Sequence, residues 1–565
     1  MINEKQKSVI LQLLLIFIIF CIYSVSKNNE IFTIWDDQHY ILKNTRLDLN
    51  LSNIIWYFKN SYFSNYIPLT MISYMADYSI GGLNSLSYHI QNIFWHILAI
   101  LAFFYILKKF NINILLAFMI CLIYAIHPQR VESVVWLSQR KDVLCSAFYL
   151  WSIFFYIKNR PKISFILFVC AILSKPMAIT LPFILCLYEY YKIKNFHFYY
   201  YFKKLYPFLI IICIFLPITY LSQGKAVNIN VPLWERFLSV SYNILWYIKQ
   251  TIIPQNLNPI YPQFFFIKNI FISFLSSAAT LLFLIYLYFK FKEKFLMIFL
   301  SYLFALFPIS GIVKLGFTDM ADRYSYIPSA FIWFGLSLII MKFMNDNSSI
   351  IFKRLVVILL LLAAIIYGLT NYKYQQNWKT PTTLADKACS YKSVSPLALK
   401  TRAGIAISSK DYKTAHLIAE DFLKLNNINI IYYNSIYCYI SAVTIKMKIA
   451  FDYNDPVKAL KYFNLIRNYI QELDPWYKNY LLTGIACYQR LGNNIKSAKI
   501  LNKILKLKNL SKFEKFYYRG LKEFYIKNYN KSLIYFEKAQ KIDSENKDVL
   551  HNIMICKKML NEKVK

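Results

Sequence analysis

Long apolar runs constrain this chain more than any other feature. Between residues 8 and 371 such runs recur, and a helix that crosses a bilayer needs about 20 mostly apolar residues. Hydrophobic residues make up 57% of the 565 residues and charged residues only 17%, whereas soluble proteins carry about a quarter. From about residue 372 onward the runs are absent. This distribution excludes a single globular enzyme, a disordered chain and a fibrous protein, and it indicates a polytopic membrane protein with a soluble C-terminal part.

The net charge of +36 comes from 65 Lys and Arg residues against 29 Asp and Glu residues. No basic block of five or more occurs, and the lysines flank the apolar runs, as membrane topology requires. Heavy use of Lys, Asn, Ile, Tyr and Phe with only 11 glycines is what codon bias in an AT-rich genome produces. We therefore expect no nucleic-acid partner. The ten cysteines show no zinc-site spacing and are expected to be buried thiols, not a disulfide framework.

The apolar runs predict about eleven membrane spans. The first run follows MINEKQK without a small-residue cleavage site, so it is expected to be a retained helix. Lys and Arg in the short loops, including KFKEK at 290–294, are placed on the cytoplasmic side. With eleven spans the N-terminus is then inside and the C-terminal part outside, and segment 236–268 is expected to be an interfacial or re-entrant element. The expected spans are 8–25, 88–107, 112–127, 142–157, 163–174, 177–190, 205–221, 270–289, 295–310, 326–342 and 352–371.

This topology gathers five charged segments on the non-cytoplasmic side, whereas the cytoplasmic loops are short and contain little but lysine. Any reaction is therefore expected on the outer face. The five segments are 26–87, 127–142, 174–176, 222–268 and 316–329.

The C-terminal part is predicted to consist of paired amphipathic helices. In its last unit a small residue, an aromatic residue and an alanine follow Gly520 at spacings of 12, 4 and 3. That spacing fits the tetratricopeptide repeat of about 34 residues, whose small residues let two helices pack closely. Segment 455–466 resembles another second helix, so four to six helix pairs are expected; a generic helical bundle is the alternative. Three glycines stand near such positions: Gly404, Gly484 and Gly520.

Asp36 and Asp37 follow the first apolar run closely. Two adjacent carboxylates near a membrane surface are costly to remove from water. One of them could act as a general base or bind a metal, and neighbouring like charges are expected to raise the pKa of one of the two. The alternative is structural, with Asp36 or Asp37 capping the N-terminus of a helix formed by DQHYILKN.

Segment 127–142 combines cations with one carboxylate. If it is helical, Glu132, Trp136 and Arg140 fall on one face, and Arg130 and Lys141 approach the membrane from the same side. Such a cluster suits a phosphate or pyrophosphate ligand, because the guanidinium fork matches phosphate oxygens. The alternative is a network of ion pairs that orders a loop.

Two more cations stand at the outer ends of apolar runs. Lys175, in Ser-Lys-Pro, could extend to the membrane surface or reach a ligand phosphate. Arg323 could pair with Asp322 or supply a second phosphate contact. No P-loop, H-E-x-x-H or G-x-S-x-G pattern occurs, so nucleotidase, zinc protease and serine hydrolase functions have no support.

Several of these segments carry a family resemblance when taken together and in order. They are WDDQHYILKN (35–44), HPQRVESVVWLSQRKDVL (127–144), LSKPMAITLPFILCLYEY (173–190) and ADRYSYIPS (321–329), followed by the repeats. The chain resembles bacterial relatives of the transmembrane and tetratricopeptide-repeat O-mannosyltransferases. Those belong to the GT-C class of integral-membrane glycosyltransferases.

The resemblance implies an all-α fold with a GT-C-like transmembrane domain at 1–371 and a tetratricopeptide-like solenoid at 372–565. It implies a lipid-linked sugar donor, such as a polyprenyl-phosphate monosaccharide, and a protein or envelope-glycan acceptor at the non-cytoplasmic face. The expected location is the bacterial inner membrane, with the repeats on the periplasmic or outer side. No cofactor is implied with certainty, and a divalent metal is left open.

The resemblance also assigns roles. In that class an acidic residue of the first outer loop is the base or metal partner, which corresponds here to Asp37 or Asp36, with Asp37 favoured as base. Basic residues of later outer loops hold the donor phosphate, and the remaining residues of segment 127–142 orient the site. The phosphate ligands expected here are Arg140, Lys141, Lys175 and Arg323, and the supporting residues are His127, Glu132 and Arg130.

Two other functions compete. A membrane scaffold could use its repeats to recruit envelope proteins, but it has no need of paired carboxylates and cationic loops. A flippase of lipid-linked sugars is expected to have ionisable groups near the middle of its spans, whereas here the charges collect at the outer ends.

Overall fold

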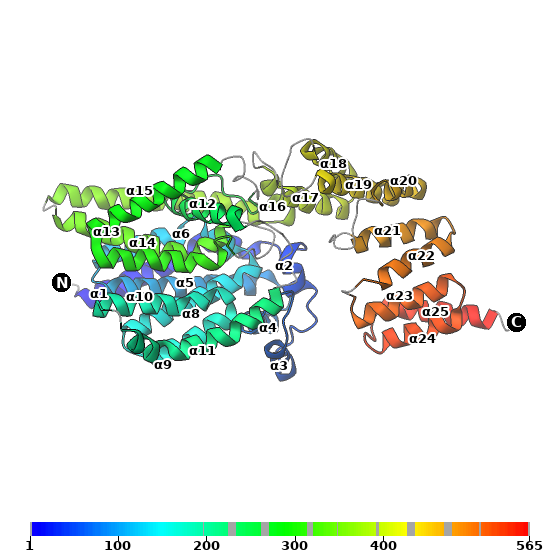
Figure 1. Cartoon of the computed structure of the whole chain (residues 1–565), viewed down its shortest axis with the longest axis horizontal. Coiled ribbons are helices and arrows are strands. Elements are labelled where there is room, and N and C mark those ends of the chain that lie inside the picture. Colours follow the sequence, from blue (N-terminus) through cyan, green and yellow to red (C-terminus); the bar gives the residue numbers. More distant parts are fainter. Residues whose placement is uncertain are drawn as a thin grey trace. The chain divides into compact units, whose positions relative to one another are not determined.

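The computed structural model describes residues 3–195, 197–223, 233–261, 270–312, 320–346, 349–390, 395–426, 435–467, 477–507 and 510–562. Within these residues the secondary structure is helical, and the sole strand-like pairing is one bridge between Tyr62 and Asn65. The chain divides into two compact units, Met1–Ser395 and Pro396–Lys565 (Figure 1). The predicted boundary at 371/372 lies within helix α15, which runs from Ile350 to Gln375.

The first unit is a helical bundle with an outer elaboration between α1 and α5. Its helices are α1 (Glu4–Tyr23), α2 (Trp35–Asp37), α3 (Leu51–Lys59), α4 (Pro68–Gly81), α5 (Ser85–Lys109), α6 (Ile114–Ile126), α7 (Arg130–Val135), α8 (Arg140–Ile157), α9 (Pro161–Ser174), α10 (Leu181–Ile193), α11 (Phe198–Gln223), α12 (Leu233–Ile252), α13 (Ile270–Leu306), α14 (Tyr326–Asp346), α15 (Ile350–Gln375) and α16 (Pro381–Cys389).

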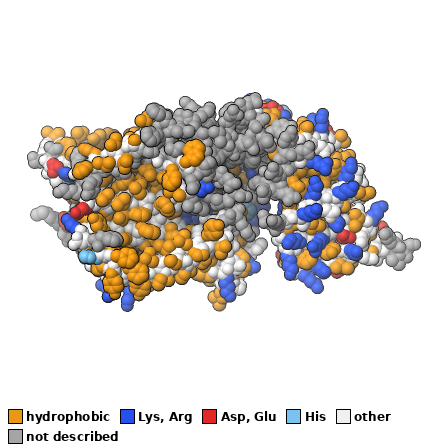
Figure 2. Space-filling view, viewed as in Figure 1, with side chains coloured by type: hydrophobic (Ala, Val, Ile, Leu, Met, Phe, Trp, Pro, Cys, Tyr) orange, Lys and Arg blue, Asp and Glu red, His pale blue; other side chains and the backbone are white. Residues whose placement is uncertain are grey.

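The first unit is a multi-pass membrane protein. Five helical segments among the described residues are long and apolar enough to cross a bilayer, and two shorter apolar helices accompany them. Hydrophobic side chains cover much of this unit in the face shown in Figure 2. The five are Glu4–Asn28, Ser85–Lys109, Phe198–Gln223, Asp322–Asp346 and Ile350–Trp378; the shorter ones are Ile114–Ile126 and Pro161–Ser174.

Helix α13 differs from the prediction. The sequence predicts a cytoplasmic loop at 290–294 between spans 270–289 and 295–310. That prediction is wrong, because α13 is one continuous helix of 37 residues. The reason is local chemistry. The segment FKFKEK contains no glycine, proline or asparagine to end a helix, and Lys and Glu are good helix formers. The count of eleven spans is thus not confirmed, and the side of the C-terminal unit stays a prediction.

The first part of segment 236–268 belongs to α12, which runs from Leu233 to Ile252. This helix is absent from the membrane-crossing set found among the described residues. Its interfacial position stays a prediction, and residues 262–269 lie outside the described part of the chain.

Helix α6 lies at the centre of the first unit. Every residue from Leu116 to Ile126 is buried, as expected for a helix that is apolar on all sides. It packs against α1, α5, α14 and α15, while α8 packs against α5 and α9. The Asn113 side chain caps the first turn of α6.

The outer elaboration forms its own apolar cluster, which includes Tyr40, Tyr57, Tyr74 and Leu137. The Tyr74 hydroxyl donates a hydrogen bond to the carbonyl of Leu137 at 2.9 Å, and its ring lies against that of Tyr40, with 6.4 Å between centroids. These contacts bring the segment after α1 to the start of α8.

The second unit is a row of antiparallel helices that form four pairs and a final helix in the described residues. The predicted second helix at 455–466 is confirmed as α20. The helices are α17 (Pro396–Ser408), α18 (Tyr412–Asn426), α19 (Ser435–Asp452), α20 (Pro456–Ile466), α21 (Tyr477–Arg490), α22 (Asn494–Leu505), α23 (Lys512–Tyr525), α24 (Tyr529–Gln540) and α25 (Lys547–Glu562).

The predicted close approach at glycine is present at two of the three positions. A Cβ atom at Gly484 would lie 2.3 Å from the ring of Phe463, and one at Gly520 would lie 2.6 Å from the ring of Phe536. Gly404 has no such neighbour within 4 Å. Small residues therefore let neighbouring helices pack closely, as the tetratricopeptide pattern requires, and the solenoid prediction is confirmed.

Candidate active site

The segment after the first span has unusual backbone geometry. Trp35 adopts a left-handed conformation with φ of 56°, which costs a bulky residue energy and is concentrated at functional sites. Its ring packs edge-on against Trp136 at 5.4 Å. A single π-helical turn, Gln38–Leu42, follows α2, and such turns are also frequent at functional sites.

Asp37 is buried and held by two other segments. Its Oδ1 accepts the N–H of Ser138 at 2.9 Å and also the Ser138 hydroxyl, and its Oδ2 accepts the N–H of Phe32 at 3.3 Å. Asp37 stands at the N-cap position of the turn Gln38–Leu42, but no side chain makes a capping hydrogen bond to that turn or to α2, so the N-cap interpretation is wrong. The carboxylate therefore has a tertiary role.

Burial raises the pKa of Asp37 to about 7, and the hydrogen bonds from Ser138 and Phe32 oppose this rise. A carboxylate with that pKa can exchange a proton near neutral pH, as a general base must. No sequence pattern marks Ser138, which stands 101 residues from Asp37. No local spacing rule connects two such positions.

Two lysine–carboxylate pairs lie at the start of α8, and one of them includes Asp36, the neighbour of Asp37 in the chain. Lys141 Nζ is 2.9 Å from Asp36 Oδ2, and Lys175 pairs with Asp142. The side chains of both lysines remain partly exposed, at 12% and 15%. We call Asp36, Asp37, Lys141, Asp142 and Lys175 the acid–base cluster. Three segments build it: the turn after α1, the start of α8 and the end of α9.

Arg140 is placed elsewhere than the phosphate role requires. Its buried guanidinium donates to Asp77 at 2.7 Å, to the carbonyl of Tyr88 at 2.7 Å and to Gln91 at 3.0 Å, and its Nε donates to Asn92. All three nitrogens are therefore engaged by protein groups. In this structure Arg140 links α8 to α4 and α5.

The predicted common face of Glu132, Trp136 and Arg140 is wrong. Helix α7 ends at Val135, Trp136 is extended with ψ of 118°, and α8 begins at Arg140. The β-branched pair Val134 and Val135 favours such an interruption. As a result Glu132 and Arg140 have different partners.

The aromatic ring of Tyr324 connects Arg323 to the acid–base cluster. Its guanidinium pairs with Glu132, and its backbone N–H donates to the same carboxylate at 2.9 Å. The ring of Tyr324 lies 4.9 Å from the Arg323 guanidinium and 5.9 Å from Lys175 Nζ. The structure thus brings Arg323 and Lys175 to the same ring.

The other supporting residues lie in the interior. Arg130 donates to the Ser325 hydroxyl, and its guanidinium lies 4.9 Å from the ring of Tyr326. His127 is buried, and its Nδ1 accepts the N–H of Gln129 at 3.3 Å. These contacts are those of residues that orient the segment. Among the described residues no group of three His, Cys, Asp or Glu side chains is arranged to hold a metal ion.

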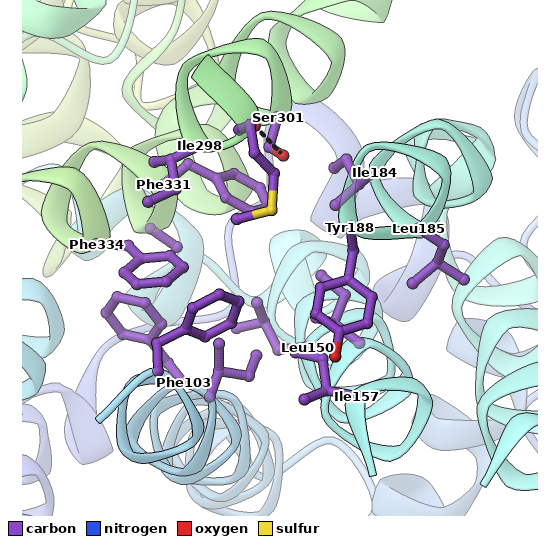
Figure 3. A pocket seen from close by; sticks show the side chains of 15 residues that line it. Phe103, Leu150, Ile157, Ile184, Leu185, Tyr188, Ile298, Ser301, Phe331 and Phe334 are labelled. Carbon is purple, nitrogen blue, oxygen red and sulfur yellow. Dashed lines mark hydrogen bonds between the residues drawn. The ribbon is translucent and has the colours of Figure 1, made fainter. Parts of the chain in front are cut away.

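A small apolar pocket lies between helices of the bundle (Figure 3). Its lining comes from five helices and includes Phe103 of α5, Leu150 of α8, Tyr188 of α10, Ile298 of α13 and Phe334 of α14. Along α8, nine residues separate Lys141 from Leu150, which corresponds to about 14 Å at 1.5 Å per residue. The pocket therefore begins below the acid–base cluster.

Known proteins share stretches of this sequence. A protein O-mannosyl-transferase of Caenorhabditis elegans is 30% identical over 133 residues, which are 22% of this chain and 19% of that protein. Human protein O-mannosyl-transferase TMTC2 is 38% identical over 100 residues, 17% of this chain and 11% of the relative. Human protein O-mannosyl-transferase TMTC3 is 28% identical over 137 residues, which are 22% of this chain and 15% of the relative. Over these stretches the chain is similar to protein O-mannosyl-transferases.

The matched stretches cover less than a fifth of each of these relatives' length. No family model matches the sequence. Among solved structures, ArnT from Cupriavidus metallidurans bound to undecaprenyl phosphate aligns with 12% identity and a TM-score of 0.33, covering 88% of this chain and 80% of ArnT. The TPR domain of P58(IPK) aligns with 9% identity and a TM-score of 0.23, and the alignment covers 74% of this chain and 99% of that domain. TM-scores this low establish no shared fold.

Proposed function

We propose that this chain is a membrane glycosyltransferase that moves a sugar from a polyprenyl-phosphate donor to a hydroxyl of a protein or envelope glycan. The reaction takes place at the non-cytoplasmic face of a bacterial inner membrane. The observation that carries the proposal is a buried carboxylate, Asp37, with its pKa near neutrality, next in the chain to Asp36, which pairs with the partly exposed Lys141. The relationship to the protein O-mannosyl-transferases supports the same chemistry.

In the proposed reaction Asp37 takes the proton of the acceptor hydroxyl as the oxygen attacks the anomeric carbon. The new glycosidic bond forms while the bond between the sugar and the donor phosphate breaks. The lipid phosphate leaves with the electron pair of that bond. Cations that lie close to the leaving oxygen stabilise the charge that develops there.

Lys141 and Lys175 are the proposed phosphate ligands, with Arg323 beside them. In the structure each lysine is neutralised by a carboxylate, and each keeps part of its side chain accessible. A donor phosphate can therefore replace Asp36 or Asp142 as the partner of an already positioned ammonium group. Arg140 has no part in this proposal, because its guanidinium is fully engaged inside the protein.

The apolar pocket is the proposed place for the first part of the donor's isoprenoid chain. Its walls are almost entirely apolar and include the aromatic rings of Phe103, Phe331 and Phe334. A lipid whose phosphate lies at the acid–base cluster can enter this space with its tail, which keeps the tail away from water. The second unit is the proposed docking surface for the acceptor.

Replacing Asp37 with Asn tests the proposal. Asn keeps the size of the side chain and an oxygen that can accept from Ser138, but it cannot act as a base. Transfer from a polyprenyl-phosphate sugar in isolated membranes should be abolished with unchanged protein abundance. Asp48→Asn, an exposed position in the same outer region, should transfer at the wild-type rate.

Wild-type transfer by Asp37→Asn would refute the base assignment. Comparing envelope proteins and glycans by mass spectrometry, with and without the chain, identifies the acceptor class. Equal sugar modification in both samples would favour the scaffold function instead. A reporter fused after Lys565 determines the side of the second unit.

A further inference from the structure

Three consecutive helices of the second unit carry basic stripes with the same spacing. In α22 and again in α23, four Lys or Arg residues follow one another at intervals of 3, 4 and 3, which places them on one side of each helix. In α24 the same spacing holds three lysines and Ile534. These residues form what we call the basic face: Lys496, Lys499, Lys503, Lys506, Lys512, Lys515, Arg519, Lys522, Lys531, Lys538 and Lys541.

The stripes of neighbouring helices lie together. The guanidinium of Arg519 in α23 is 5.9 Å from the ring of Tyr535 in α24, and Lys538 Nζ in α24 is 6.0 Å from the ring of Phe516 in α23. Helix α22 packs against α23. Lys and Arg side chains gather over these helices in the view of Figure 2.

The protein itself neutralises little of this charge: in the described residues Lys522 lies 3.8 Å from Glu523. Between residues 494 and 541 thirteen Lys and Arg stand against three Asp and Glu. Glu514 is engaged by Lys478 of α21, which lies outside the basic face. The first helices of the unit differ, because there the acids are matched to the lysines: Lys446 pairs with Glu420 at 2.7 Å, and Lys448 pairs with Asp452 at 2.8 Å. Charge repulsion across the basic face is thus left for an outside partner to relieve.

The composition of the face indicates an extended anionic surface. Ten of its eleven cations are lysines, which are hydrated point charges without the planar fork that recognises a single phosphate. Two isoleucines stand among them, Ile495 with 69% and Ile534 with 51% of the side chain exposed. Lysines interspersed with exposed apolar side chains are typical of helices that lie at a lipid headgroup layer.

The chain also keeps this unit near a membrane. Helix α15, which is long and apolar enough to cross the bilayer, ends at Gln375, and the second unit begins at Pro396. A short connection raises the effective concentration of a lipid surface for the attached unit. We propose that the basic face binds the anionic headgroups of the membrane in which the first unit is embedded. The proposal is independent of the glycosyltransferase function.

Lysine acylation of the full-length chain in nanodiscs tests the proposal. One preparation uses phosphatidylcholine alone, and the other uses an equal mixture of phosphatidylcholine and phosphatidylglycerol. In the anionic discs Lys499, Lys503 and Lys515 should react about fivefold more slowly with a water-soluble acylating reagent, as read by peptide mass spectrometry. Lys410 and Lys413 should react equally in both discs. High salt should remove the protection, because it screens exposed charges.

A charge-neutralised variant supplies the second measurement. In Lys499→Gln/Lys503→Gln/Lys515→Gln the protection of Lys538 in anionic discs should be lost. Neutralising three exposed lysines elsewhere in the unit, Lys410, Lys413 and Lys424, should leave it intact. All six positions are exposed, so both variants are expected to fold.

Two results would overturn the proposal. One is equal acylation of the basic face in the two kinds of disc. The other is protection that arises only when soluble polyglutamate is added to phosphatidylcholine discs, because that result assigns the face to an acidic polymer.

Discussion

Replacing Ser138 with Ala isolates the control of Asp37 by its neighbour. The substitution removes the hydroxyl that donates to Asp37 Oδ1 and keeps the backbone N–H bond at 2.9 Å to the same oxygen. Ser138 lies in a short 3₁₀ turn, Leu137–Gln139, which alanine can adopt. The expected change is therefore electrostatic, with little effect on the fold.

The magnitude follows from the lost hydrogen bond. A bond to a charged group contributes about 1.5 to 3 kcal/mol, and 1.36 kcal/mol corresponds to one pKa unit, so the pKa of Asp37 should rise by about one to two units. Starting from about 7, the ionised fraction at pH 7 falls from about one half to about one tenth or less. Because the base works only when ionised, the rate near neutral pH should fall about five- to fifty-fold and recover as the pH rises.

The assay is the initial rate of sugar transfer at saturating donor and acceptor across the neutral and alkaline range. Ser138→Thr keeps the hydroxyl and should keep the wild-type midpoint. Ser133→Ala removes another buried hydroxyl of segment 127–142, one without a hydrogen-bond partner in the described structure, and should also leave the midpoint in place. A uniformly lower rate with an unmoved midpoint in Ser138→Ala would refute the assignment of Asp37 as the titrating base.

Three further substitutions test other parts of the structure. Lys175→Gln removes a proposed phosphate ligand and should lower kcat about 10²-fold with normal abundance; an unchanged kcat would exclude Lys175 from the leaving-group site. Asp77→Ala leaves a buried guanidinium without its carboxylate and should cost about 3 to 5 kcal/mol, measured as a lower Tm in detergent, and a wild-type Tm would contradict the buried pair. Gly520→Ala places a Cβ 2.6 Å from an aromatic ring and should cost about 1 to 3 kcal/mol, whereas Gly404→Ala meets nothing within 4 Å and should not lower the Tm. Equal unfolding temperatures for the two glycine variants would contradict the packing of the second unit.

Part of the site can be predicted from the sequence, because placing a charged side chain near a membrane has a high free-energy cost. Asp36, Asp37, Lys141 and Lys175 stand out as ionisable groups at the ends of apolar runs, and the structure pairs Lys141 with Asp36 and Lys175 with Asp142, the residue after Lys141. The paired helices of the second unit also follow from local patterns, since a small residue in register with an aromatic one is a short-range signal.

The tertiary partners do not follow from the sequence. Arg140 pairs with Asp77, 63 residues away, and Glu132 pairs with residue 323, 191 residues away. Helical periodicity predicts which side chains share a face of a helix. It does not predict which of several cations forms an ion pair with a buried carboxylate. For the same reason the sequence marks Arg140 as a phosphate ligand, although the structure places it among protein acceptors. A drop in hydropathy at 290–294 likewise indicates a loop where helix-forming residues continue α13.

The start of α8 explains how one helical turn can serve both stability and chemistry. Successive residues of a helix are about 100° apart, so Arg140, Lys141 and Asp142 point in three directions. The first meets the buried Asp77, the second meets Asp36 and the third meets Lys175. Because the first pair is fully buried, it fixes the rotation of α8 about its own axis. The positions of the accessible pairs, and of Ser138 against Asp37, are therefore set by an ion pair that no substrate needs to touch.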